Sequence, residues 1–227
     1  MSSICKIDHL VIAALTLEEG VEYVREILGV EIPAGGSHST LATHNHLMTI
    51  GENIFLEVIA PDYAAEESAD RLNQPRWFGL DDPHVKASLQ QSPGLLTWVV
   101  NTQSIDDMAA AATWPLGNIV DVSRGDLSWR FALPFDGALQ AGGMLPYAMQ
   151  WGTSVHPANN MADCGIRLEK LEILHPKAEW LGEQLASVNA EGLVTIQEAP
   201  EATAPTLIAT FLSTASGERI TLRSLNV

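Results

Sequence analysis

Hydrophobic and polar positions near the start of the chain predict a strand followed directly by a helix. Residues 4–14 alternate and then become wholly apolar, which is typical of a strand that enters a core. The apolar stripe of the following helix is formed by Leu17, Val21, Val24 and Leu28. Thr16 and Glu19 have the spacing of a capping box, and Gly29 stands where a left-handed C-cap is expected. We therefore expect the helix to end at Leu28.

The same order occurs a second time further along the chain. A glycine-rich stretch at 35–38 and strand-like runs at 41–50 and 53–60 follow the first helix. In the second copy, a strand precedes a helix, and three strand-like runs follow; these elements are expected at 94–101, 104–114, 118–123, 127–134 and 145–151. The pattern therefore predicts a repeated strand-helix-strands unit.

The spacing between strand and helix cap is the same in both copies. His9 precedes the cap Thr16 by seven residues, and Thr97 precedes the cap Ser104 by seven. We expect His9 and Thr97 at equivalent positions. The last quarter has a similar order, with a strand at 165–174, a helix that Pro176 opens and three further strand-like runs, so it predicts a third unit.

Several runs of residues resemble one known family. They are IDHLVI at 7–12, GGSH at 35–38, FLEVI at 55–59, PRWFGLD at 75–81, and Arg124, Trp129 and Arg130 with the segment 146–152. In order and spacing they resemble the glyoxalase-like domain of the vicinal oxygen chelate superfamily, which also includes bleomycin resistance proteins and dihydroxybiphenyl dioxygenases. The resemblance covers roughly residues 4–155.

The resemblance implies an α+β fold with repeated βαβββ modules whose curved mixed sheets enclose a cleft. The modules are expected at 4–60 and 94–152, with a connector at 61–93 between them. A C-terminal βαβββ-like unit at 165–227 is expected to pack on this glyoxalase-like domain.

The resemblance also implies where a divalent metal would bind. In this superfamily the ligands come from the first and fourth strands of each module, which points to His9, Glu57, Thr97 and Gln150. Imidazole and carboxylate suit zinc, manganese, nickel or iron, and an amide oxygen is a weaker donor. Thr97 is a poor replacement for a ligand. If the strand face that carries His44 and His46 looks into the cleft, His46 or His44 could complete the metal shell, and His46 could act as a base instead.

Each candidate has a structural alternative. His9 could be a core histidine that bonds to a backbone carbonyl, and Glu57 could face solvent; if Glu57 is buried, it needs a metal, a cation or a raised pKa. Arg76 could bind an acidic group of a substrate or pin the connector to the sheet. The remaining substrate-binding candidates are Trp98, Trp129 and Arg124, with Trp151 as a further aromatic wall.

Composition and charge exclude several classes of protein. The 227 residues are 46% hydrophobic, and 28 acidic against 12 basic residues give a formal charge of −16, which opposes binding to nucleic acids and anionic membranes. No apolar run approaches the roughly 20 residues of a membrane helix, and the N-terminus lacks the pattern of a signal peptide. Cys5 and Cys164 are too few for a disulfide framework, so we expect a cytoplasmic protein. A homodimer is possible.

Two functions from different classes fit these observations. The first is a metal-dependent isomerase, lyase or dioxygenase acting on a small oxygenated molecule, with His9, Glu57 and Gln150 as ligands, and Glu57 and His46 as catalytic groups. The second is a metal-free protein that binds or sequesters a small ligand in the same cleft.

Overall fold

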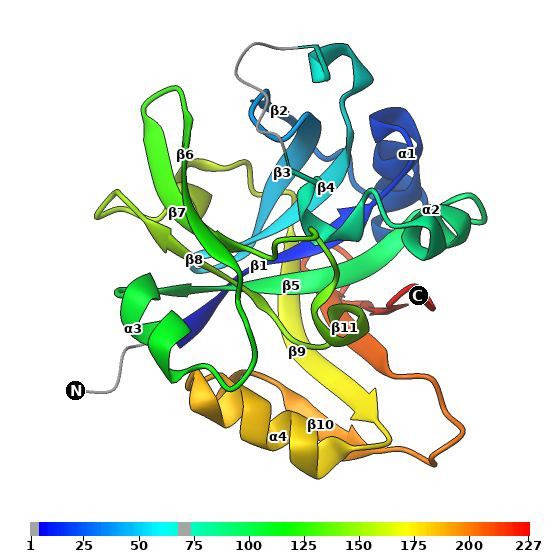
Figure 1. The fold of residues 1–227 in the computed structure, drawn as a ribbon. Coiled ribbons are helices and arrows are strands. Elements are labelled where there is room, and N and C mark those ends of the chain that lie inside the picture. Colours follow the sequence, from blue (N-terminus) through cyan, green and yellow to red (C-terminus); the bar gives the residue numbers. More distant parts are fainter. Residues whose placement is uncertain (1–4, 68–73) are drawn as a thin grey trace.

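The protein has an α+β fold built on one curved, nearly closed, mixed sheet and a second, smaller sheet (Figure 1). The computed structural model describes residues 5–67 and 74–227; residue 4, the first of the predicted domain, and residues 68–73 of the predicted connector lie outside the described residues. The strand order of the large sheet is β2-β3-β4-β1-β5-β8-β7-β6, and that of the small sheet is β10-β9-β11-β12. The predicted α+β class with a curved mixed sheet is confirmed, and the repeated βαβββ modules stay a prediction.

The order of elements in the first part of the chain recurs in the second. The first part contains β1 (Cys5–Ala13), α1 (Leu17–Leu28), β2 (Ala34–His38), β3 (Thr43–Gly51) and β4 (Ile54–Pro61). The helix α2 (Pro83–Leu89) precedes the second part, which contains β5 (Gly94–Thr102), α3 (Ile105–Ala111), β6 (Asn118–Arg124), β7 (Leu127–Leu133) and β8 (Tyr147–Trp151). The two parts meet where β1 pairs antiparallel with β5.

The register between β1 and β5 agrees with the expected equivalence of His9 and Thr97. His9 pairs with Val99, and Val11 pairs with Thr97. If a two-fold axis between the strands exchanges His9 with Thr97, it also exchanges Val11 with Val99. The pair His9–Val99 then becomes the pair Thr97–Val11, which is the other observed pair. Each first strand also pairs in parallel with the last strand of its own part, β1 with β4 and β5 with β8.

The predicted first helix is confirmed in detail, whereas the second is shorter than expected. Thr16 and Glu19 form both bonds of the capping box, and Gly29 adopts φ 69° after the last helical residue. The helix α3 ends at Ala111 instead of reaching Trp114. Pro115 disfavours a helical conformation at the residue before it, which explains why the helix does not extend that far.

The C-terminal unit has the expected order of elements but a different strand arrangement. It comprises β9 (Ile166–His175), α4 (Ala178–Ser187), β10 (Thr195–Glu198), β11 (Thr206–Ser213) and β12 (Arg219–Arg223). Here β9 pairs in parallel with β10, the strand directly after the helix, which is a simple β-α-β crossover. In the first two parts, the parallel partner is the last strand instead.

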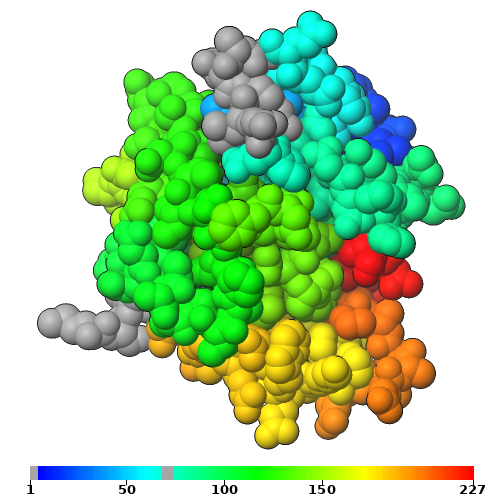
Figure 2. Space-filling view, in the orientation of Figure 1, coloured from blue at the N-terminus to red at the C-terminus, as the bar shows by residue number. Residues whose placement is uncertain are grey.

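Two buried clusters occupy the two faces of the large sheet. One contains Leu10 and Trp98 together with Leu171 and Phe211, so it joins the large sheet to the C-terminal unit. Figure 2 shows this unit, in yellow and orange, beneath the rest of the molecule. The other cluster lies on the opposite face and includes Val99, so neighbouring residues of β5 serve different clusters. None of the helices in the described residues has the length and apolar character to cross a membrane.

Candidate active site

A cleft opens on the concave face of the large sheet. Its space is about 450 Å³, including the open mouth. Its polar lining comes from His9, His38, Asn45, Glu57 and Arg124, and its apolar lining from Leu47, Phe55, Trp77, Phe78, Trp129, Phe131, Met149, Trp151, Pro157 and Met161. A few polar groups in a largely aromatic enclosure are typical of a small-molecule site.

A β-bulge in β1 places two neighbouring polar side chains in one buried network. Ile7 pairs with Val100 and His9 pairs with Val99, so Asp8 is the extra residue of the bulge. Regular alternation would send the side chains of Asp8 and His9 to opposite faces of the sheet. In the structure, Asp8 Oδ1 instead accepts a hydrogen bond from His9 Nδ1 at 2.7 Å.

Asp8 is fully buried and accepts hydrogen bonds from four side chains. Besides His9, these are Trp151 at 2.7 Å, Asn101 at 2.9 Å and His156 at 2.9 Å, all bonded to Oδ2. The Nδ1 of His156 accepts from the backbone N–H of Ala158, which makes Nε2 the donor to Asp8. Burial alone would raise the pKa of Asp8, but hydrogen bonds from His156 and His9 hold this pKa well below its usual range.

His9 is charged, and one of its ring nitrogens lacks a hydrogen bond. Burial would lower its pKa, but the carboxylates of Asp8 and Glu57 outweigh burial and raise the pKa to about 9. Its Nε2 lies 3.4 Å from Glu57 Oε2, an ion-pair distance, and makes no hydrogen bond of normal geometry. The ring stacks on Phe55 with centroids 4.4 Å apart.

Glu57 is the second carboxylate of the network and lines the cleft. Asn45 Nδ2 donates to its Oε1 at 2.6 Å, and His9 faces its other oxygen. Burial alone would raise the pKa of Glu57, but the adjacent His9 imidazolium lowers it. A buried, ionised carboxylate beside an imidazolium is an arrangement that can exchange a proton with a bound molecule.

Arg124 brings a second cation to the cleft from the far end of the sheet. Its Nη1 donates to Asn45 Oδ1 at 3.2 Å and lies 3.4 Å from His38 Nε2. A Cβ at Gly36 would lie 3.1 Å from the Arg124 side chain, so any larger residue there would shift Arg124 by a few tenths of an ångström. Burial and the positive charge of Arg124 lower the pKa of His38 to about 4. His38 is therefore neutral at physiological pH.

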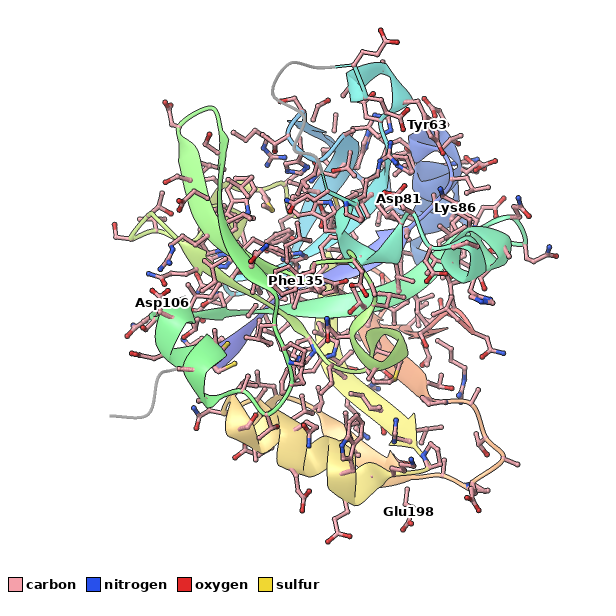
Figure 3. The ribbon with its side chains drawn as sticks, viewed as in Figure 1. Tyr63, Asp81, Lys86, Asp106, Phe135 and Glu198 are labelled. Carbon is pink, nitrogen blue, oxygen red and sulfur yellow. The ribbon has the colours of Figure 1, made fainter. Side chains whose placement is uncertain are left out.

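The connector contributes aromatic walls through Trp77 and Phe78, whereas Arg76 holds the connector in place. Arg76 donates to Ala42 O at 2.9 Å and Asp81 at 2.6 Å, bonds to Glu66, and lies over the ring of Tyr63. Figure 3 shows Tyr63 and Asp81 in the same upper part of the molecule. Arg76 does not line the cleft.

The structure brings some of the predicted site residues together and separates others. His9, Glu57, Arg124, Trp129 and Trp151 all line the cleft. Four other predicted residues have hydrogen-bond partners outside the cleft. Trp98 donates to Met144 O, and Thr97 donates to Gly143 O. Gln150 accepts a hydrogen bond from Ile105 N, and His46 Nδ1 lies 2.7 Å from Ile32 O. The face of β3 that lines the cleft carries Asn45 and Leu47, and alternation places His44 and His46 on the opposite face.

The donor set of the cleft does not fit a divalent metal. Only His9 and Glu57 of the predicted ligands face each other, and the guanidinium of Arg124 approaches the same site. Within residues 5–67 and 74–227, no three His, Cys, Asp or Glu side chains are grouped so that they could hold a metal ion. A zinc, manganese, nickel or iron site needs at least one further protein ligand.

Comparisons with known proteins identify the family. The glyoxalase-like domain family matches residues 7–189, most of the chain, so the protein belongs to this family. A crystal structure of a hypothetical protein from Staphylococcus aureus is similar over 98% of this chain and 86% of that chain, with a TM-score of 0.56 and 13% identity, which supports the fold. No curated protein matches the chain.

Methylmalonyl-CoA epimerases are more distant structural neighbours. A variant of the Streptomyces coelicolor enzyme in complex with 2-nitronate-propionyl-CoA has a TM-score of 0.40 at 18% identity, covering 66% of this chain and 98% of that chain. The Mycobacterium tuberculosis enzyme has a TM-score of 0.39 at 18% identity, covering 64% and 86%.

Sequence reasoning missed four polar residues of the site: Asp8, His38, Asn45 and His156. An acid within an apolar strand is a signal that could have indicated Asp8, because a buried carboxylate requires partners. His156 lies in a loop where the sequence has no comparable signal.

The charge on His9 predicts how stability depends on pH. Because the folded pKa of about 9 is above the ordinary value of 6.5, protonation of His9 stabilises the fold fully below pH 6.5, and this contribution is lost as pH rises through 9. We expect the melting temperature to fall by about 5 °C or more across this range. Thermal unfolding of wild type and His9→Gln measures this effect. The variant should show a flatter profile, and identical profiles would contradict a charged His9.

Proposed function

We propose that the cleft binds a small oxygenated molecule bearing a carboxylate and catalyses proton transfer on it, as an isomerase or lyase does. The observation that carries this proposal is the buried Nε2 of His9, which lacks a hydrogen bond and lies 3.4 Å from Glu57 Oε2 in the cleft. An unsatisfied buried donor is costly, and a ligand oxygen would satisfy it.

Arg124 is suited to bind the carboxylate of such a molecule. It is half-buried and lines the cleft, and its hydrogen-bond contacts are with the uncharged side chains of Asn45 and His38. A guanidinium binds carboxylates through paired N–H donors. Trp129 and Trp151, with ring centroids 5.4 Å apart, provide apolar surface for the rest of the molecule.

The two remaining polar groups can divide the chemistry between them. Glu57, as a carboxylate, would take a proton from a carbon next to a carbonyl group, and the electron pair of that C–H bond would form an enolate. The Nε2–H of the His9 imidazolium would donate to the enolate oxygen, which stabilises the charge that develops there. Where the enolate is conjugated with a second double bond, its electron pair can take the proton from Glu57 at the far carbon of that double bond, which completes an isomerisation.

A metal-dependent reaction, including a dioxygenase reaction, is less well supported because of the donor set of the cleft. A metal-free binding protein is the second candidate, and the enclosure by Phe55, Trp129 and Trp151 favours it. The two candidates differ in whether bound molecules exchange carbon-bound protons with solvent.

Binding can be tested with phenylpyruvate, a small aromatic acid with a carbonyl group beside its carboxylate. We expect it to quench tryptophan fluorescence, and Arg124→Gln to weaken binding by about tenfold or more because a charged hydrogen bond is lost. The control is Arg130→Gln on the neighbouring strand, where Arg130 pairs with Asp106, labelled in Figure 3, outside the cleft. Equal losses in both variants would contradict a role for Arg124 in binding the acid.

A further inference from the structure

Trp77 has a buried indole N–H with no acceptor at the wall of the cleft. Its side chain is 3% exposed and lines the cleft, yet Nε1 makes no hydrogen bond within the part of the chain that the structure describes. The indoles of Trp98 and Trp151 are different, because they donate to Met144 O at 3.1 Å and to Asp8 at 2.7 Å. A buried donor normally has a partner, so the exception at Trp77 needs an explanation.

The backbone around Trp77 is held in a defined conformation. Trp77 opens a short turn in which Phe78 has φ 58° and Gly79 has φ 65°. A left-handed conformation is unfavourable for phenylalanine and occurs only where the surrounding structure enforces it. Here Gly79 N donates to Gly137 O at 2.7 Å, and Arg76 is anchored to Ala42 O at 2.9 Å.

Two residues that line the same cleft, His9 and Trp77, therefore each carry a buried nitrogen without a hydrogen bond, Nε2 and Nε1. Contacts hold both side chains: His9 bonds to Asp8 and stacks on Phe55, and the Trp77 indole packs edge-on against the ring of His38. A carbonyl oxygen has two lone pairs and can accept from two donors. If Arg124 binds the carboxylate of an acid, a carbonyl oxygen of the same acid remains free to accept from His9 and Trp77.

We propose that Trp77 determines specificity: its indole N–H donates to the non-carboxylate oxygen of the bound acid and so selects acids that carry a carbonyl group. This inference rests on the proposed function and adds to it the class of substrate. An acid without that oxygen leaves the indole N–H unpaired, so it binds without the free energy of this hydrogen bond.

Two acids that differ in this oxygen test the inference: phenylpyruvate and 3-phenylpropionate, which keeps the ring and the carboxylate. Their affinities are measured by titration calorimetry on wild type, Trp77→Phe and Trp114→Phe. Trp114 is a suitable control because its indole N–H also lacks an acceptor, but it packs in the cluster on the other face of the large sheet. We expect wild type to prefer phenylpyruvate, and Trp77→Phe to reduce this preference by about fivefold. Trp114→Phe should leave the preference unchanged.

A second measurement covers the case in which Trp77→Phe fails to fold. The indole N–H signals of the wild type are first assigned in ¹H–¹⁵N spectra. Phenylpyruvate should then shift the Trp77 N–H signal downfield, because a hydrogen bond forms, and 3-phenylpropionate should not.

The outcomes separate this inference from the proposed function. If Trp77→Phe weakens both acids equally, or Trp114→Phe changes the preference as much, Trp77 is only a packing residue and the inference is wrong while the proposed function stands. If neither acid binds folded wild-type protein, the proposed function fails, and the inference fails with it.

Discussion

Replacing Glu57 with Gln should slow the exchange of carbon-bound protons on a bound acid by at least about 100-fold, the usual contribution of a general base. The amide keeps the shape of the side chain but cannot accept a proton. Binding of phenylpyruvate should change only a few-fold, because Arg124 and the aromatic walls remain. The measurement is incorporation of deuterium from D₂O into phenylpyruvate, followed by NMR above the rate in buffer alone.

The control for this substitution is Glu52→Gln, an exposed residue in the turn before β4. Exchange that persists in Glu57→Gln would contradict the role of Glu57 as the base. The metal-dependent alternative predicts a different result. Wild type would retain one equivalent of a divalent metal and Glu57→Gln would lose it, because this variant removes the anionic member of the predicted ligand set.

Replacing Asp8 with Asn should cost about 3–5 kcal/mol of folding free energy, the usual effect of breaking a buried ion pair. Asp8 accepts from four donors, and an asparagine amide would turn its own N–H₂ group towards some of them. The pKa of His9 should also fall, because the carboxylate that offsets its burial is removed. Denaturant unfolding measures the first effect, and NMR titration of the imidazole measures the second.

Asp163→Asn is the matched control for Asp8→Asn. Asp163 also pairs with a cation, Arg167 at 2.6 Å, but it lies on the surface, where such pairs contribute about 1 kcal/mol or less. If Asp8→Asn cost no more than this control, Asp8 would not organise the site.

Much of the fold could be predicted because the local pattern and the tertiary structure agree. The capping box at Thr16 and the glycine at position 29 determine where α1 begins and ends, whatever the helix packs against. β2 was harder to predict, because its AGGSH sequence has no strand character and becomes a strand only by pairing with β3. The strand order of the C-terminal sheet also depends on long-range pairing and could not be read from the sequence.

The site was less predictable than the fold, for two physical reasons. Period-two alternation separates His46 from Asn45 but does not say which face of β3 looks into the cleft. A single-residue bulge at Asp8 and a left-handed residue at Phe78 then redirect side chains against the regular pattern. The domain boundaries and the possible homodimer stay predictions.

The most direct test of the central proposal is a crystal structure of the wild-type protein with phenylpyruvate. The predicted result is the acid in the cleft, with its carboxylate on Arg124 and its carbonyl oxygen within hydrogen-bond distance of His9 Nε2. An acid bound outside the cleft, or a metal ion bridging His9 and Glu57, would contradict it.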